Sequence, residues 1–230
     1  MNFVYALFIP LGILVLYNFI RRSAPHKHEV TYLSFAISVL LTSFLTDFIK
    51  NAAGRPRPDL IARCNPIPDT QANKLVTIDV CRETNHHKLH DGWRSFPSGH
   101  SSFSFAGLGY LAIFLAGQLH IFRFSRGGRD LSRALFCLVP LLGATMIAIT
   151  RLEDYRHDVY DVCFGGLLGL VIAYWSYRRH WPALTSSNSD EPHPKPSELQ
   201  AAGWNRIRDE EEAVGNENVG FEMTNMTGSG

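Results

Sequence analysis

The sequence predicts an all-α fold, a polytopic membrane helical bundle with five spanning helices. Five stretches approach the roughly 20 mostly apolar residues that a helix needs to cross the bilayer core. Paired arginines directly follow the first and the last stretch, and a polar segment ends the chain. The mean hydropathy of −0.03 hides this pattern, because it averages apolar stretches with the polar segment. The predicted spans are Phe3–Ile20, Val30–Ile49, Ser101–Phe122, Ala134–Thr150 and Val159–Tyr177.

Particular features of four of these stretches bear on the prediction. The first lacks a leading positive charge and a clear cleavage site, so we expect it to stay in the membrane rather than to be removed as a signal peptide. The second carries one carboxylate, Asp47, near its end, and the third has no Asp, Glu, Lys or Arg. In the fifth, Gly165 and Gly169 form a pattern that lets membrane helices approach closely. The alternative, buried helices of a soluble protein, fits poorly with five such stretches in 230 residues.

The polar segment 51–97 is too long for a simple connection, so we expect it to form a lid or a recognition element. It contains Cys64 and Cys81, which could form a disulfide if the segment faces an oxidising compartment. Cys137 and Cys163 lie in apolar stretches, where we expect them to be small buried side chains. The four cysteines are too dispersed for a zinc site of the C-x-x-C type.

We expect two parts in the chain, a membrane-embedded domain over residues 1–180 and a tail over residues 181–230. The tail is rich in proline and then in acidic residues at 209–212, which is typical of a disordered segment, and we expect it in the cytosol. The net charge of +1 gives no overall field that would favour nucleic acid as a partner. The expected partner is the membrane itself, and the oligomeric state stays open.

The alternating directions of the spans bring four helix ends to one face of the membrane. These are the end of the second span, the start of the third, the end of the fourth and the start of the fifth. The opposite face carries basic short loops, and the positive-inside rule makes that face cytosolic. The four ends would then face a lumen or the cell exterior, with vacuole, endoplasmic reticulum and Golgi all open. The basic residues are Arg21, Arg22, Lys27, Arg123, Arg126, Arg129, Arg133, Arg178 and Arg179.

One cluster of functional residue types lies between the fourth and fifth spans. His157 and Asp161 are four residues apart, so we expect them on one face of a helix. A carboxylate that accepts from one imidazole nitrogen leaves the other free to act as a nucleophile or base. Arg151 offers a planar fork that matches phosphate oxygens. The alternative is a satisfied surface histidine followed by a helix-capping aspartate.

A second cluster, Pro97–His100, directly precedes the third span. A Ser98–Gly99 turn there presents a hydroxyl and backbone N–H groups to an anion, and the helix N-terminus adds a favourable potential. His100 is placed to donate a proton to a leaving oxygen. The alternative is an ordinary N-cap followed by a polar histidine.

A third cluster follows the second span, with Lys50 at its end and Arg57 seven residues later. Pro56 and Pro58 stiffen the chain around Arg57 and keep it from continuing as a helix. Lys50 alone could be a lysine that reaches for the membrane interface. Three cations and two histidines on one face together favour a phosphate site.

Jointly these clusters resemble the three signature motifs of the type 2 phosphatidic acid phosphatase superfamily. The resemblance implies a helical fold of the class that this superfamily shares with the vanadium haloperoxidases. Residues 50–59, 91–100 and 153–157 are most similar to the fungal diacylglycerol pyrophosphate phosphatases and lipid phosphate phosphatases. The likeness extends over nearly all of residues 1–179.

The resemblance implies a role for each matching residue. His157 would be the nucleophile that forms a phosphohistidine, and Asp161 would orient it. His100 would be the acid for the departing group and then the base for water. The phosphate ligands would be Lys50, Arg57, Ser98, Gly99 and Arg151. Such a site takes its positive charge from side chains, so the resemblance implies no metal and no cofactor.

Two departures from the family pattern are present. The third motif usually opens with serine, where this chain has Thr150, which keeps the hydroxyl. The membrane members of the family usually have one span more than the five predicted here, and the start of this chain resembles their second span.

The expected activity is hydrolysis of phosphatidate, lysophosphatidate or diacylglycerol pyrophosphate. Alternatives are an isoprenoid pyrophosphate, a sphingoid phosphate or a soluble phosphate as substrate. A further alternative is an inactive membrane scaffold or lipid-binding protein.

Overall fold

The structure is a computed structural model that describes residues 2–68, 70, 74, 77–122, 131–195 and 197. The chain divides into two compact units, and the first, Met1–Pro192, carries all the features below. Its helices are α1 (Asn2–Ile20), α2 (Pro25–Ala53), α3 (Leu60–Cys64), η1 (Ile78–Val80), α4 (His86–Asp91), α5 (Gly99–Gln118), α6 (Leu131–Glu153) and α7 (Val159–His180).

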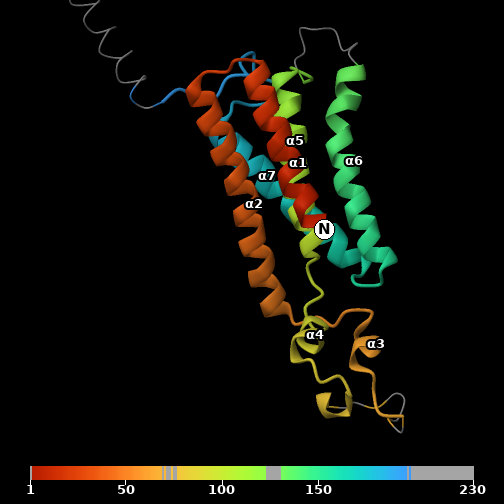
Figure 1. Cartoon of the computed structure of the whole chain (residues 1–230). Helices are drawn as coiled ribbons and strands as arrows, with labels where there is room; N and C mark the ends of the chain where they lie inside the picture. The colour runs from red at the N-terminus through yellow and green to blue at the C-terminus, as the bar shows by residue number, and fades with distance from the viewer. Residues whose placement is uncertain are drawn as a thin grey trace, which may run out of the picture. The chain divides into compact units, whose positions relative to one another are not determined.

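Five long helices form a bundle around α5, which packs against α1, α2, α6 and α7 (Figure 1). The short helices α3 and α4 lie beyond one end of the bundle. Within the described residues, the only β pairing is an isolated bridge between Pro66 and Cys81. The predicted all-α bundle is therefore confirmed.

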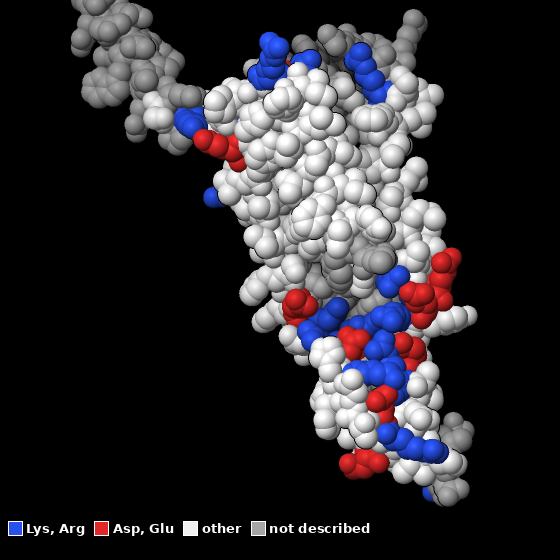
Figure 2. Space-filling model, in the orientation of Figure 1, with Lys and Arg blue, Asp and Glu red and all other residues white. Residues whose placement is uncertain are grey.

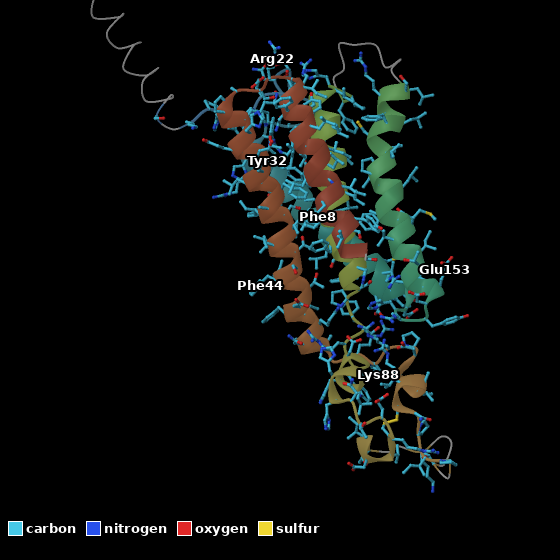
Figure 3. All side chains as sticks on the ribbon, viewed as in Figure 1. Phe8, Arg22, Tyr32, Phe44, Lys88 and Glu153 are labelled. Atoms are coloured by element: carbon cyan, nitrogen blue, oxygen red, sulfur yellow. A yellow bond between two sulfur atoms is a disulfide. The ribbon has the colours of Figure 1, made fainter. Side chains whose placement is uncertain are left out.

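Four of the helices, α2, α5, α6 and α7, are long and apolar enough to cross a membrane. The first predicted span, Phe3–Ile20, corresponds to α1, whose apolar part, Val4–Ile20, is shorter. Figure 2 shows a broad belt without charge between basic residues at one end and a charged cluster at the other. Large apolar side chains are exposed along this belt. Phe44, labelled in Figure 3, points away from α2 and is 66% exposed.

A stripe of hydroxyl side chains holds α2 against the rest of the bundle. Ser38 donates to the carbonyl of Ala106 at 3.1 Å, and Thr46 donates to Ser102 at 2.8 Å. Such contacts suit helices in a membrane, where apolar surface gives little drive for helices to associate. The stripe consists of Thr31, Ser34, Ser38, Thr42 and Thr46, all of which are buried.

Small residues allow α7 to lie directly against α5. A Cβ atom at Gly165 would lie 2.6 Å from the carbonyl oxygen of Ser98, and one at Gly169 would lie 2.3 Å from that of Ser102. The small-xxx-small pattern of the sequence therefore marks the surface on which these two helices meet. This approach fixes the start of α5 beside the start of α7.

The loop module, residues 54–98, connects α2 to α5. Gly54 ends α2 in a left-handed conformation, with φ at 55°, which favours glycine. A disulfide joins Cys64, at the end of α3, to Cys81, directly after η1. The predicted long segment is thus a small structured element, although residues 69, 71–73, 75 and 76 lie outside the described residues.

The C-terminal strap, residues 181–191, differs from the expectation of a tail that begins at 181. Trp181 is fully buried, and Ser189 donates to the carbonyl of Gly117 at 2.9 Å. The first compact unit accordingly reaches Pro192 rather than residue 180. Beyond it, only residues 193–195 and 197 are described, so the expected disorder of the remaining tail lies outside the described residues.

Candidate active site

The eight site residues predicted from the sequence lie at one end of the bundle, close to the loop module. Lys50 is in the last turn of α2, Arg151 is in the last turn of α6, and Ser98 precedes α5. In Figure 3, Glu153 of α6 and Lys88 of the loop module mark this end, and Arg22 marks the other. Figure 2 shows the charged side chains gathered here below the belt.

His157 lies just before α7 rather than within it. Asp158 is the N-cap of α7, so the expectation that His157 and Asp161 share a helix face is wrong in its detail. The turn still brings them together, with Nδ1 of His157 at 3.7 Å from Oδ2 of Asp161. His157 is 4% exposed and Asp161 is fully buried.

Several groups bind the carboxylate of Asp161. Arg55 donates to Oδ1 at 2.7 Å, the hydroxyl of Ser95 donates to Oδ2, and the backbone N–H of Asp158 donates to Oδ2 at 3.1 Å. The last bond completes a capping box at the start of α7. Asp161 therefore both caps the start of α7 and faces His157.

Burial is the largest influence on His157. It lowers the pKa of the imidazole to about 4, and the charges of Arg57 and Lys50 act in the same direction, while Asp161 opposes them. A neutral imidazole has a lone pair on one ring nitrogen, which is what a nucleophile needs. Since Nδ1 faces Asp161, Nε2 is the nitrogen directed away from that carboxylate.

The start of α5 contributes the second predicted cluster. The hydroxyl of Ser98 accepts from the backbone N–H of Ser101 at 3.5 Å, and the N–H of Ser98 donates to the carbonyl of Asp161 at 2.9 Å. The N–H of Ser98 is thus engaged by the fold rather than directed to a ligand. Gly99 and His100 begin the helix, where backbone N–H groups lack partners within the helix.

The side chain of Lys50, from the last turn of α2, lies beside the start of α5. A Cβ atom at Gly99 would lie 3.2 Å from Nζ of Lys50, so glycine leaves room for the ammonium group. The side chain of Lys50 therefore places a positive charge at the helix N-terminus, where an anion is already favoured.

Arg57 is buried in the loop module, and a carboxylate fixes its direction. Its Nε donates to the backbone carbonyl of Asp91 and its Nη2 to Oδ1 of Asp91, both at 2.8 Å. Arg63 donates to Oδ2 of Asp91 at 2.9 Å. Burial works to raise the pKa of Asp91, but Arg57 and Arg63 outweigh it and lower that pKa below its usual value.

Arg151 is the third predicted cation of the site and lies in the last turn of α6. Its Nη2 lies 2.9 Å from Oδ2 of Asp154, and its Nε and Nη2 also donate to the hydroxyl of Thr150 at 3.3 and 3.2 Å. The threonine that replaces the usual serine of the motif thus contacts the arginine beside it.

Three residues of the site escaped the prediction from sequence, namely Arg55, Ser95 and Asp91. Each lies within a few residues of a predicted one, in Gly54–Arg55–Pro56–Arg57 and in Asp91–Pro97. Their residue types carried little signal of a role, because serine and aspartate are common in turns. Their partners could not be read from spacing, because the loop module brings together residues far apart in the chain.

The arrangement offers an imidazole with a lowered pKa, a second histidine and several cations at one end of the helix bundle. Among the described residues, no group of three His, Cys, Asp or Glu side chains is placed to hold a metal ion. Guanidinium and ammonium groups around one imidazole suit an anion with several oxygens, such as phosphate.

Comparison with known proteins supports this interpretation. The sequence profile of the PAP2 superfamily matches residues 31–184, which include every predicted site residue. The chain belongs to the PAP2 superfamily. The family resemblance drawn from the three clusters is therefore confirmed.

Relatives within the PAP2 superfamily match most of the chain. Diacylglycerol pyrophosphate phosphatase 1 of Saccharomyces cerevisiae is 39% identical over 92% of this chain and 74% of its own length. Probable diacylglycerol pyrophosphate phosphatase 1 of Schizosaccharomyces pombe is 44% identical over 77% of this chain and 63% of its own length. Lipid phosphate phosphatase 2 of Arabidopsis thaliana is 36% identical over 82% and 63%.

The crystal structure of Aquifex aeolicus LpxE matches only weakly, with 19% identity and a TM-score of 0.40 over 76% of this chain and 83% of that one. Membership in the PAP2 superfamily thus rests on the sequence matches. Together with the apolar helices, it makes this chain an integral membrane protein.

Proposed function

We propose that this protein is a lipid phosphate phosphatase that works through a phosphohistidine on His157. One observation carries the proposal: a buried, neutral imidazole beside a carboxylate lies among cations at the end of a membrane bundle. The printed names of the relatives, diacylglycerol pyrophosphate phosphatase and lipid phosphate phosphatase, agree with it.

The reaction has two steps. Nε2 of His157 attacks phosphorus, the bond to the leaving oxygen breaks, and His100 gives that oxygen a proton. His100 then takes a proton from water, and the water oxygen attacks phosphorus of the phosphohistidine. The bond from phosphorus to Nε2 breaks, which releases phosphate and regenerates His157. The carboxylate of Asp161, 3.7 Å from Nδ1, stabilises the positive charge that forms on the ring.

The cations stabilise the charge on the phosphoryl oxygens. Lys50, Arg57 and Arg151 approach from α2, the loop module and α6. Because Asp91 holds Nε and Nη2 of Arg57, Nη1 is the donor we assign to phosphate. Gly99 contributes a backbone N–H at the start of α5, and Ser98 contributes through its hydroxyl.

The membrane setting favours a lipid substrate. The candidate site lies where the uncharged belt of the bundle ends, so the phosphate of a lipid could reach His157 while the acyl chains stay in the bilayer. The basic residues at the opposite end favour a lumenal or extracellular site by the positive-inside rule. Phosphatidate, lysophosphatidate and diacylglycerol pyrophosphate are the substrates we propose.

The test is phosphate release by the purified protein in detergent with excess chelator. Phosphatidate, diacylglycerol pyrophosphate and an isoprenoid pyrophosphate are offered separately. We expect release from at least one lipid, and a loss of about 1,000-fold or more in His157→Ala, which lacks the nucleophile. His86→Ala is the matched control, because His86 is exposed on α4, and it should keep wild-type activity.

Two outcomes would overturn the proposal. Full activity in His157→Ala would exclude the phosphohistidine, and loss of activity in chelator would make a metal part of the reaction. Release from the isoprenoid pyrophosphate alone would replace the proposed substrates but keep the chemistry.

A further inference from the structure

We propose that Arg55 and Ser95, which lie outside the matched motif positions, are positioning residues that act on His157 through Asp161. The inference rests on the proposed function, because it concerns the residue that we assign as nucleophile. We call the two side chains with Asp161 the carboxylate clamp.

Arg55 holds two carboxylates at once. Its Nη1 donates to Oδ1 of Asp161 at 2.7 Å, and its Nη2 donates to Oδ2 of Asp158 at 3.0 Å. These aspartates are the first and last members of the capping box of α7. The planar guanidinium therefore fixes the two carboxylates relative to each other, with one hydrogen bond to each.

Ser95 lies between the carboxylate and the imidazole. Its hydroxyl donates to Oδ2 of Asp161, and its oxygen lies 3.5 Å from Nδ1 of His157. The carboxylate oxygen itself is farther from Nδ1, at 3.7 Å. Because a hydroxyl accepts with its lone pairs while it donates its proton, Ser95 can pass the orienting hydrogen bond from His157 to Asp161.

The two side chains act as a unit. The backbone N–H of Ser95 donates to the carbonyl of Arg55 at 2.9 Å, so the two ends of the loop module are joined beside Asp161. Arg55 donates to Oδ1 of Asp161 and Ser95 donates to Oδ2. Since Asp161 is fully buried, loss of Arg55 removes the side-chain donor to Oδ1, and loss of Ser95 leaves Oδ2 with the backbone N–H of Asp158 alone.

The clamp should affect turnover rather than substrate binding. Loss of the partners that orient metal-ligating histidines typically costs about 10–100-fold, and we expect a similar factor for partners that orient a nucleophilic histidine. We expect Ser95→Ala and Arg55→Gln each to lower kcat by about that factor, with KM changed by less than about 3-fold. Arg55→Lys, which keeps the charge but loses the fork, should restore only part of kcat.

The deciding measurement is a double-variant cycle with Asp161→Asn. If Ser95 and Arg55 act through Asp161, their loss should cost little more once Asp161 has been replaced. Purified variants are assayed with phosphatidate in detergent micelles, and thermal unfolding shows that each is folded. Lys88→Met is the matched control, because it removes an exposed ion pair with Glu83 in the same loop module. Its kcat should equal that of the wild type.

Additive losses in the cycle would overturn the inference, because they would mean that Arg55 and Ser95 act independently of Asp161. Wild-type kcat in both single variants would overturn it as well. Either result would leave the proposed function intact, since the wild-type protein would still release phosphate.

A second measurement tests the clamp without turnover. NMR of histidine-labelled protein follows the titration of His157, and the resonance is assigned by its absence in His157→Ala. Arg55→Gln removes a cation from Asp161, so the carboxylate is less neutralised and the pKa of His157 should rise. An unchanged titration would overturn the clamp even if no lipid is hydrolysed. The charged groups that face His157 are Arg57, Lys50, Asp161 and His100.

Discussion

At the scale of single residues, the site depends on an imidazole that stays neutral. His157 is deeply buried and has two cations nearby, and both conditions disfavour its protonated form. A nucleophile of this kind remains competent in an acidic lumen, where an ordinary histidine would be largely protonated. The lowered pKa therefore keeps His157 in its neutral form even in a mildly acidic compartment.

The titration of His157 tests this view. The folded protein lowers the pKa of the group to about 4, so the neutral form is kept as the pH falls and is lost only below that value. Histidine NMR of the wild-type protein should show His157 titrating near pH 4, well below the ordinary value of about 6.5. A midpoint at or above the ordinary value would contradict the burial argument.

Spacing in the sequence predicted which residues would lie together in the site. It predicted fewer of the contacts between them. Lys50, Arg57, His100, Arg151 and His157 were identifiable because each is a strong phosphate ligand or base at the end of an apolar stretch. The contact of Arg57 with Asp91 depends on the fold of a loop, and no periodicity specifies it. His157 lies before the helix because Asp158, rather than Asp161, is the N-cap of α7. The sequence offered both aspartates as possible caps.

At the scale of helices, the approach of α5 and α7 fixes the site. The site residues of both helices lie in or next to their first turns, and Gly165 and Gly169 set how closely these turns approach. The sequence predicted a close contact from the glycine pattern, but not which helix would be the partner. Glycine is required here because the neighbouring atoms belong to the backbone of α5, which cannot move aside.

A methyl group at Gly169 should therefore destabilise the bundle. In Gly169→Ala the new Cβ would meet Ser102 O at 2.3 Å and Ala106 N at 2.9 Å, so the helices must separate. We expect a loss of about 1–3 kcal/mol, the usual range for overpacking. Thermal unfolding in detergent measures it.

Gly12→Ala is the matched control, because nothing lies within 4 Å of a Cβ atom at Gly12 in α1. Alanine there should leave the unfolding temperature unchanged or raise it slightly, since it favours helix more than glycine does. Equal effects of the two variants would mean that the α5–α7 contact is not tight.

At the scale of the whole molecule, the orientation in the membrane remains a proposal from charge. Basic residues gather at the end of the bundle away from the site (Figure 2), as the positive-inside rule requires of a cytosolic face. Four of the five predicted spans correspond to helices long and apolar enough to cross a membrane, because apolar length is a strong signal. The fold of residues 181–191 was not, since a short polar segment shows no periodicity.

A glycosylation acceptor tests the orientation. His87→Thr completes an Asn-x-Thr sequon at Asn85, which is exposed on the loop module. In eukaryotic cells this variant should gain a glycosidase-sensitive increase in size, and His87→Ala should not. The sequon present at Asn225–Met226–Thr227 should stay unmodified, because we expect it in the cytosol. Glycan at Asn225 without glycan at Asn85 would reverse the orientation.

The C-terminal strap has a consequence for the order in which the molecule is completed. The carbonyl of Asp190 accepts from Gln118, at the end of α5, and from Lys27, near the start of α2. Ribosomes add residue 190 only after every helix of the bundle has been made. The start of α2 and the end of α5 can therefore be joined through Asp190 only after all the helices of the bundle have been synthesised.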